Sequence, residues 1–339
     1  MKRKVLGALA VVVCLGMLGC GQPAAPGPNA EGSSDGQTAS GGSAQKKLVI
    51  GFSQCNSAEP YRTAQNNIFK SKQKEYGDGY ELVIHDAQQD NSKQRAQIEN
   101  LILQKVDLLI VAPNEATPLT GVVKSAHDAG IKVICLERDL AEPVYDAFVG
   151  ADNVAIGEMA GQYVKEHCEG KGIQNPVVVE MKGLLGTKPQ EERHNGARKN
   201  IDTIAGVTVI EEVANWLQDE AKKRMQTLLQ ANPKIDVVYA HNDPMAVGCY
   251  LAAQEAGREK EMIFVGVDGL GGEAGGIKKV IDGVLACTFV YPPCAAEAFD
   301  YGVKMLKGEK VEPRIILQPT KVTPENAKEL YEKATIAAP

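Results

Sequence analysis

Short apolar runs alternate with longer amphipathic stretches along the first half of the chain, starting near residue 48. The short runs predict buried strands, and the stretches with helical period predict helices between them. The predicted strands are Leu48–Ser53, Glu81–Asp86, Asp107–Ala112, Lys132–Leu136 and Ala147–Gly150. The predicted helices are Tyr61–Tyr76, Ser92–Lys105 and Pro118–Ala129. This alternation is typical of a parallel sheet with helices on both faces.

The second half of the chain shows the same alternation. Its predicted strands are Val177–Met181, Val207–Val213, Val237–Ala240, Ile263–Val267 and Ala286–Val290. Its predicted helices lie near Ala155–Cys168, Glu192–Ile201, Asp219–Gln230, Pro244–Ala256 and Gly272–Asp282. The predicted fold class is therefore α/β, with two doubly wound parallel-sheet lobes.

The two halves also share residues at a nearly constant offset, which indicates an internal repeat. The matching pairs are Asp107 and Asp236, Asn114 and Asn242, Gly130 and Gly257, and Glu137 and Asp268, at offsets of 129, 128, 127 and 131 residues. Solenoid repeats are typically about 20 to 50 residues long, so this period suits a duplicated domain instead.

Polar side chains follow the predicted strands, where ligands bind in open α/β sheets. They are Ser53, Asn114, Glu137, Arg138, Asn242 and Asp268. A carboxylate accepts hydrogen bonds from two hydroxyls, and a guanidinium donates to adjacent oxygens. The pattern therefore favours a site for the vicinal hydroxyls of a sugar. An exposed ion pair at the start of a loop is the alternative interpretation of Glu137 and Arg138.

Other chemistry has weaker support in the sequence. The single Trp, Trp216, follows a predicted strand and can either stack on a sugar ring or fill the core. Residues 269–274 fit a dinucleotide fingerprint, but the carboxylate of Asp268 would repel a pyrophosphate there. The chain has neither a G-x-S-x-G motif nor a Walker loop, and its five histidines lack metal-ligand spacing. We therefore predict no catalytic residue, no cofactor and no metal.

Residues 1–20 resemble a lipoprotein signal peptide. Three cations precede the apolar run Val5–Leu18, which is short for a membrane span, and Gly19-Cys20 follows it. The sequence predicts a lipid on Cys20, with an ordinary signal peptide and a chance cysteine as the alternative. Residues 21–47 are rich in Gly, Pro and Ser and predict a disordered linker behind the anchor.

Charge and cysteine content narrow the partners of the mature chain. Loss of the three signal cations changes the formal net charge from −6 to −9, which argues against nucleic acid as a partner. Export permits disulfides, but the sequence does not give their pairing. The cysteines beyond the signal are Cys55, Cys135, Cys168, Cys249, Cys287 and Cys294.

Several segments carry a resemblance over roughly residues 46 to 335. They are residues 50–54, 61–64, 136–138, 150–153, 186–187, 193–196, 239–243 and 265–269. As an ordered set, they resemble the periplasmic sugar-binding proteins of bacterial ABC importers, of the ribose- and galactofuranose-binding kind. The resemblance implies a type I periplasmic binding protein fold, with a sugar held between the lobes.

The resemblance also implies roles for individual residues. Glu137 and Arg138 take the place of an Asp-Arg pair in the family. Tyr61 and Arg62 stand where ribose binders have two Phe residues, and Tyr291 stands where they have Gln.

In the second lobe, Arg193 matches an arginine that contacts sugar hydroxyls, and Trp216 matches the aromatic stacking position. Asn242 and Asp268 match polar positions at strand ends. Glu59 is added from the first loop, so that three carboxylates and three arginines make a site of balanced formal charge. Such a site should prefer a neutral sugar or polyol, since a buried uncompensated charge is costly.

The predicted organisation is an N-terminal lobe of residues 46–151 and 292–317 and a C-terminal lobe of residues 152–291 and 318–335. The three crossings, near Gly150, Tyr291 and Gln318, would serve as hinges. We predict an exported, lipid-anchored monomer that delivers its ligand to an ABC permease. A ligand-presenting receptor for a sensor kinase or chemoreceptor and a carbohydrate-active enzyme are the alternatives.

Overall fold

The computed structural model describes residues 47–336. The described residues belong to one compact unit. The predicted signal peptide, the lipidation site at Cys20 and the linker up to residue 46 lie outside the described residues. Within the described part of the chain, no helix combines the length and apolarity needed to cross a membrane.

The first sheet has six parallel strands in the order β11-β5-β4-β3-β1-β2. Its strands are β1 (Leu48–Gln54), β2 (Tyr80–Asp86), β3 (Leu108–Val111), β4 (Lys132–Leu136), β5 (Ala147–Ala151) and β11 (Arg314–Leu317). Its helices are α1 (Pro60–Tyr76), α2 (Asn91–Leu103), α3 (Ala116–Asp128) and α9 (Ala295–Leu306), and a short 3-10 turn, η1 (Gly77–Gly79), follows α1.

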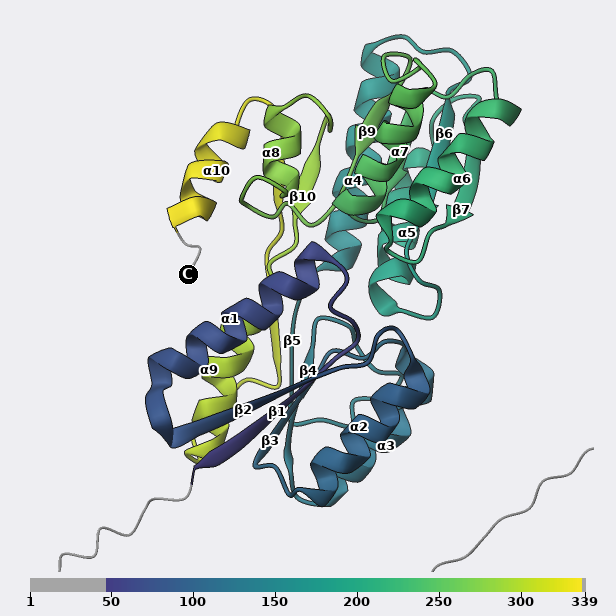
Figure 1. Ribbon diagram of the computed structural model, residues 1–339. Coiled ribbons are helices and arrows are strands. Elements are labelled where there is room, and N and C mark those ends of the chain that lie inside the picture. Colours follow the sequence, from purple (N-terminus) through teal and green to yellow (C-terminus); the bar gives the residue numbers. More distant parts are fainter. Residues whose placement is uncertain (1–46, 337–339) are drawn as a thin grey trace, which may run out of the picture. The chain divides into compact units, whose positions relative to one another are not determined.

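Alternation along the strands explains why both faces of this sheet are covered. On β3, Leu108 and Ile110 pack in the cluster with α1 and α9, whereas Leu109 and Val111 pack with α2 and α3. Figure 1 shows these two helix pairs on opposite faces of the sheet. Since successive side chains of a strand point to opposite faces, an unbroken apolar run gives a doubly covered sheet.

The second sheet repeats this topology. Its order is β7-β6-β8-β9, and isolated parallel bridges from Val265 and Asp268 bring β10 to the open edge of β9. The order β7-β6-β8-β9-β10 thus matches β2-β1-β3-β4-β5 of the first sheet. Its strands are β6 (Val177–Lys182), β7 (Thr208–Val213), β8 (Val237–Ala240), β9 (Ile263–Val265), β10 (Thr288–Val290) and β12 (Thr320–Val322).

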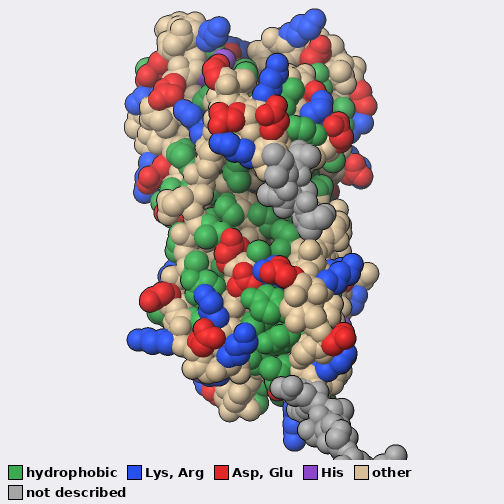
Figure 2. Space-filling model, turned by 90° about the vertical axis from the view of Figure 1, so that its left-hand side faces the viewer, with side chains coloured by type: hydrophobic (Ala, Val, Ile, Leu, Met, Phe, Trp, Pro, Cys, Tyr) green, Lys and Arg blue, Asp and Glu red, His purple; other side chains and the backbone are tan. Residues whose placement is uncertain are grey.

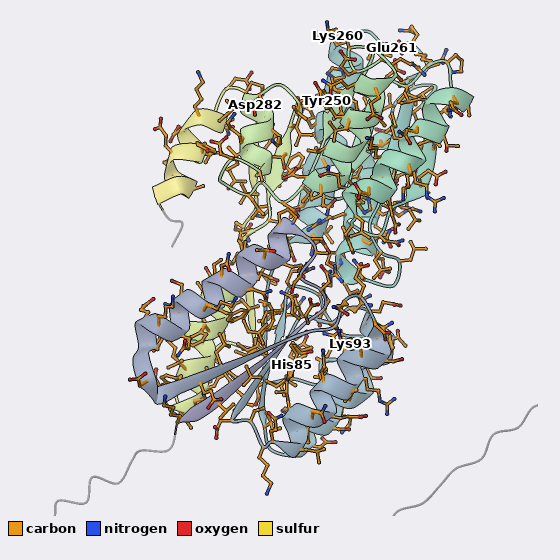
Figure 3. All side chains as sticks on the ribbon, viewed as in Figure 1. His85, Lys93, Tyr250, Lys260, Glu261 and Asp282 are labelled. Carbon is orange, nitrogen blue, oxygen red and sulfur yellow. The ribbon has the colours of Figure 1, made fainter. Side chains whose placement is uncertain are left out.

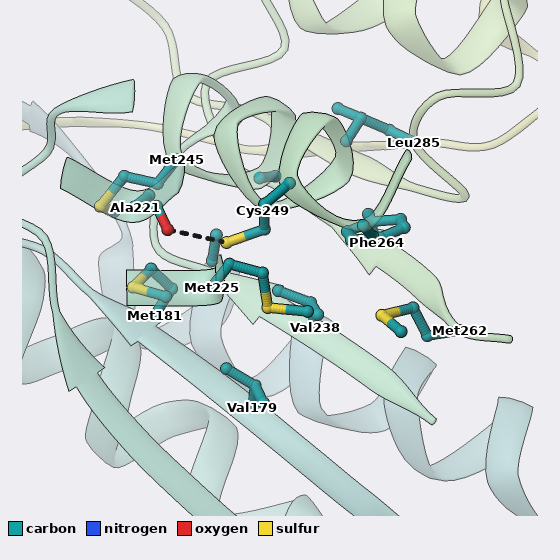
Figure 4. Packing of buried hydrophobic residues seen from close by; sticks show 14 of the residues in the cluster. Val179, Met181, Ala221, Met225, Val238, Met245, Cys249, Met262, Phe264 and Leu285 are labelled. Carbon is teal, nitrogen blue, oxygen red and sulfur yellow. Dashed lines mark hydrogen bonds between the residues drawn. The ribbon is translucent and has the colours of Figure 1, made fainter. Parts of the chain in front are cut away.

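Helices cover both faces of the second sheet as well. They are α4 (Asn153–Gly170), α5 (Lys188–Ile201), α6 (Gln218–Ala231), α7 (Asp243–Glu255), α8 (Gly276–Ile281) and α10 (Ala327–Ile336). Helices α4 and α5 pack on one face, and α6 and α7 on the other. Figure 4 shows Met225 and Cys249 packed over Val179 and Val238 in the second of these cores.

The predicted α/β fold is confirmed, and the structure adds elements that the hydrophobic pattern did not reveal. These are α9, β11, β12 and α10, all beyond residue 294. The strand β12 pairs antiparallel with β10, so the second sheet is not wholly parallel. The helix predicted over Gly272–Asp282 is shorter, because the glycine-rich turn before Gly276 does not join it.

The chain passes between the two sheets at three places. It leaves β5 at Ala151 for α4, leaves β10 at Val290 for α9, and leaves β11 at Leu317 for β12. On the face drawn in Figure 2, basic and acidic side chains are interspersed, without a large area of one sign. That face lacks the basic surface typical of nucleic-acid binding.

Candidate functional site

All ten residues that the sequence predicts for the ligand site line one cavity. They are Glu59, Tyr61, Arg62, Glu137, Arg138, Arg193, Trp216, Asn242, Asp268 and Tyr291. The cavity is narrow, with a volume of about 10 Å³ open to the centre of a water-sized sphere. Each lining residue is at most 6% exposed. That they bind a ligand stays a prediction, which the geometry below supports.

The parallel topology explains why residues so distant in sequence meet. Glu137 follows β4, Trp216 follows β7, Asn242 follows β8, and Asp268 follows β9. The carboxyl ends of parallel strands share one edge of a sheet, so their loops converge there. Both sheets supply such loops, and the first turn of α1 adds Tyr61 and Arg62.

A buried ion pair anchors the first-lobe side of the cavity. Arg62 Nη1 lies 2.6 Å from Glu137 Oε2, and Arg138 Nε lies 3.8 Å from the same oxygen. Burial acts to raise the pKa of the Glu137 carboxyl, but the guanidinium groups of Arg62 and Arg138 outweigh it and lower that pKa. Glu137 is therefore an ionised acceptor. Arg62 makes the closer contact with Glu137, although Arg138 is its neighbour in the sequence.

Arg193 is fixed from the second lobe by contacts that sequence reasoning missed. Its Nε donates to Asn153 Oδ1 at 2.9 Å, and its Nη1 donates to the carbonyl oxygen of His241. The backbones of α4 and α5 lie so close together that a Cβ at Gly157 would be 2.5 Å from the Arg193 carbonyl oxygen. The small residue at position 157 thus sets where Arg193 enters the cavity.

Aromatic rings and guanidinium groups form the cavity walls together. The Trp216 ring lies 5.5 Å from the guanidinium carbon of Arg138 and 5.6 Å from that of Arg193. Tyr61 and Tyr291 stack with ring centroids 5.4 Å apart. Trp216 also belongs to the core cluster under α6 and α7, so it helps to fill the core. Its place in the cavity lining is compatible with stacking on a sugar ring, which stays a prediction.

Two equivalent positions of the repeat have left-handed backbone. Glu137 has a φ of 66° and Asp268 a φ of 129°, and each follows the matching strand of its lobe. Such conformations cost on the order of 1–3 kcal/mol for residues other than glycine and cluster at ligand sites. The strain at both strand ends therefore adds to the case for a functional site.

Two further carboxylates, Glu59 and Asp268, line the cavity. Glu59 is 5% exposed, and its Oε1 accepts a hydrogen bond from Asn56 Nδ2 at 2.7 Å. Burial raises the pKa of the Asp268 carboxyl well above its usual value, and the neighbouring Asp243 raises it further. Asp268 thus has the opposite electrostatic environment to Glu137.

Asp243 is a buried group that the sequence analysis did not single out. Its Oδ1 accepts from Thr288 Oγ1 at 2.6 Å, and its Oδ2 accepts from the Gly269 backbone N–H at 2.8 Å. Burial raises its pKa to about 7. A carboxylate at the start of a predicted helix gave no reason to expect burial, because acidic residues are common in a first turn.

Asn242 has a structural role besides lining the cavity. Its side-chain oxygen accepts from the Met245 backbone N–H at 3.0 Å and so caps α7, and its Nδ2 donates to the Trp216 carbonyl oxygen at 3.0 Å. The amide therefore joins two site loops of the second lobe. Among residues 47–336, the cavity-lining donors Arg62 Nε, Arg138 Nε and Trp216 Nε1 are buried without a hydrogen-bond partner.

A second polar cluster lies within the second lobe. Glu180, His194 and Glu211 bring potential metal-ligating atoms within 4.8 Å of one another, although the histidine spacing suggested no such group. Arg198 lies 2.7 Å from Glu211, and Lys182 also pairs with that carboxylate. The two cations already neutralise the cluster, which does not favour a metal there.

In the described chain, the six cysteines from Cys55 to Cys294 are buried and free.

Comparison with known proteins agrees with this fold and site. Residues 50–310 match the family described as the periplasmic binding protein domain. The ribose import binding protein of Escherichia coli strain K12 is 33% identical over 236 residues, which cover 69% of this chain and 77% of that protein. The galactofuranose-binding protein of the same strain is 31% identical over 297 residues, covering 84% and 91%.

Among solved structures, the fructose-binding periplasmic domain of a hybrid two-component system superposes with a TM-score of 0.81. It is 35% identical, and the match covers 86% of this chain and 95% of that domain. The chain belongs to the periplasmic binding protein family. The resemblance drawn from the sequence is thereby confirmed. The family consists of binding proteins that act in the periplasm after export.

Proposed function

We propose that this protein captures a small neutral sugar or polyol between its lobes and delivers it to an ABC importer. One observation carries the proposal: ten polar and aromatic side chains from both lobes line a single buried cavity that retains unpaired donors. Ligand hydroxyl groups can accept hydrogen bonds from those donors and donate to the Glu137 carboxylate. The Trp216 side chain offers an aromatic face on which a sugar ring can stack.

The relatives support this assignment by what they bind. Similar proteins are named for import of ribose and for binding of galactofuranose, and one similar structure holds myo-inositol. Arg62, in the place of an apolar aromatic, has a buried Nε without a partner among the described residues, which can donate to one more hydroxyl than a pentose has. We therefore favour a hexose or cyclic polyol over ribose.

A thermal-shift panel tests the function directly. The panel comprises D-ribose, D-fructose, D-galactose, myo-inositol, D-galacturonate and ribose 5-phosphate. A ligand present at 100 times its dissociation constant stabilises the folded state by about 2.7 kcal/mol, which raises the melting temperature clearly. A shift with a neutral compound supports the proposal. Tighter binding of the uronate or the phosphate than of every neutral compound would overturn the predicted preference.

A receptor for a sensor kinase is the second candidate. The similarity to the fructose-binding domain of a hybrid two-component system favours it. Uptake of the radiolabelled sugar by cells with and without the gene separates the two functions. Loss of uptake on deletion supports import, whereas unchanged uptake with loss of a sugar-induced transcriptional response supports signalling.

The anchor is proposed from Gly19-Cys20 and the apolar run before it. The lipid would hold the chain at a membrane by the 21–47 linker, as a monomer. The variant Cys20→Ala should move the protein from the membrane fraction to the soluble fraction. Unchanged fractionation would exclude lipidation at this residue.

A further inference from the structure

Two loops with the same place in the repeat meet beside the cavity. One follows β2 and contains Gln88 and Gln89, and the other follows β7 and contains Asn215 and Trp216. The offset from Gln88 to Asn215 and from Gln89 to Trp216 is 127 residues, within the range set by the other matching pairs. The contact therefore joins equivalent loops of the two lobes.

Both loops have an unusual backbone. The φ angles are 56° at Gln88, 61° at Gln89, 51° at Asn215 and 72° at Trp216. Four of the nine non-glycine residues with positive φ among residues 47–336 thus lie in these two loops. Left-handed backbone outside glycine is retained where surrounding contacts over-determine it, so the contacts of these loops indicate their function.

The contact between the loops is a hydrogen bond from one side chain. Gln89 Nε2 donates to the Asn215 carbonyl oxygen at 3.4 Å, one residue before the Trp216 ring. The rest of the Trp216 turn is held from its own lobe, by Asn242 on the Trp216 carbonyl oxygen and by Glu220 on the Asn215 side chain. Gln89 therefore gives this turn a hydrogen bond from the first lobe, in addition to the Arg138 guanidinium that faces the Trp216 ring.

Gln89 is itself linked to a cavity residue. Its carbonyl oxygen accepts from Asn114 Nδ2 at 3.1 Å, and the Asn114 carbonyl oxygen accepts from Arg138 Nη1 at 3.1 Å. The Arg138 guanidinium faces the Trp216 ring from the first lobe. A continuous set of contacts thus runs from Arg138 through Asn114 and Gln89 to the turn that carries Trp216.

We propose that Gln89 is a positioning residue for ligand stacking. Resting on the proposed sugar-binding function, the inference is that Gln89 acts through Asn215 to hold the Trp216 ring against the cavity when the lobes meet. The Trp216 ring would then reach its stacking position at the same time as the lobes come into contact. A sugar that needs the ring gains affinity from a residue that does not touch it.

The neighbouring glutamine provides a matched control. Gln88 has the same backbone conformation, but its side chain is exposed and accepts from Lys93 Nζ at 2.8 Å within the first lobe. Figure 3 labels Lys93 on α2. The variants Gln89→Ala and Gln88→Ala therefore make the same chemical change in the same loop, and Gln89→Glu keeps the shape while it removes the donor.

The first measurement needs no sugar. Trp216 is the single Trp of the chain, so intrinsic fluorescence reports on this ring alone. Acrylamide should quench Trp216 more strongly in Gln89→Ala and Gln89→Glu than in wild type, whereas Gln88→Ala should match wild type. Equal quenching in all four proteins, both without ligand and with a saturating sugar, would overturn the proposal.

The second measurement uses the neutral compound that binds tightest in the panel above. One hydrogen bond contributes about 0.5–1.5 kcal/mol, so Gln89→Ala should weaken binding about two- to tenfold and Gln88→Ala less than twofold. In a Trp216→Phe background, Gln89→Ala should cost much less, because coupled residues are not additive. Full additivity in this cycle would contradict action through Trp216. If no compound of the panel binds, the proposed function is refuted, and the quenching measurement alone decides whether Gln89 positions the ring.

Discussion

The two lobes place a carboxylate at the same point of the same topology, yet give it opposite electrostatics. Glu137 follows β4 and Asp268 follows β9, and both have left-handed backbone. The arginines around Glu137 outweigh its burial and lower its pKa, whereas burial and Asp243 raise the pKa of Asp268. The repeat thus determines the position of each carboxyl group. The neighbouring side chains, arginines for Glu137 and Asp243 for Asp268, determine the direction in which its pKa is shifted.

Removal of Arg62 is expected to have the largest effect. Arg62→Ala removes the closer of the two guanidinium groups beside the buried Glu137 carboxylate, which should lower the free energy of unfolding by up to about 3–5 kcal/mol. Urea denaturation measures the change. The exposed pair Lys124–Asp128, at 2.6 Å, provides the control, since Lys124→Ala should cost at most about 1 kcal/mol. Equal effects of the two variants would refute a special role for the buried pair.

The arginines of the opposing lobes should matter next, for binding. Arg138→Ala and Arg193→Ala each truncate a buried charged hydrogen-bond set, which should weaken sugar binding by about 2–5 kcal/mol. Isothermal titration calorimetry measures the loss, with circular dichroism as the control for folding. A change below about threefold in either variant, or roughly 0.7 kcal/mol, would remove that arginine from the site.

The dependence of stability on pH separates the two carboxylates. A carboxyl with a raised pKa in the folded state stabilises at low pH and loses that contribution as the pH rises from its unfolded value toward about 7, the folded value of Asp243. Each such group contributes a slope of about 1.4 kcal/mol per pH unit within this window. Glu137 acts in the opposite sense, and its contribution is lost as the pH falls through its lowered pKa.

Asp243→Asn should therefore flatten the decline in stability between about pH 4 and pH 7. Asn keeps an acceptor for Gly269 and a partner for Thr288, so the fold should survive. Denaturation at a series of pH values provides the test. A profile identical to wild type would contradict the raised pKa of Asp243.

The smallest expected effect is a change in compactness. If ligand closes the lobes about the three crossings, small-angle scattering should give a smaller radius of gyration with a saturating sugar than without it. The variant Arg138→Ala, measured at the same sugar concentration, provides the unliganded control. An identical radius for wild type in both conditions would contradict hinge closure, although not binding.

Sequence patterns were sufficient for residues at strand ends. Glu137 and Asp268 stand directly after apolar runs, and parallel pairing brings such positions together without further information. Arg193 lies within a helix, so periodicity alone could not place it. Only the resemblance to a family indicated the role of Arg193. The close packing of its backbone against Gly157 explains how the side chain reaches the cavity.

The supporting residues could not be predicted, because their roles depend on tertiary contacts. Asp243 and Gln89 look like ordinary polar residues at the start of a helix and in a turn, and the contacts at Gly269 and Asn215 give them their roles. Helix α9 was missed although its buried residues, among them Ala295, Ala298 and Phe299, recur at helical spacing. Its apolar residues, such as Phe299, pack against α1 and β1, which lie more than 200 residues earlier in the chain.

The three passages between the sheets have a consequence for the order in which the protein can fold. The first sheet is complete only after β11 pairs with β5, and Arg314 aligns with Phe148 from far along the chain. The second lobe is complete only after α10 packs against α8. A chain that emerges with its N-terminus first therefore cannot finish either lobe until nearly all of it is synthesised. Contacts between such distant segments slow folding, so a nascent precursor should remain incompletely folded, and thus competent for translocation, until late in its synthesis.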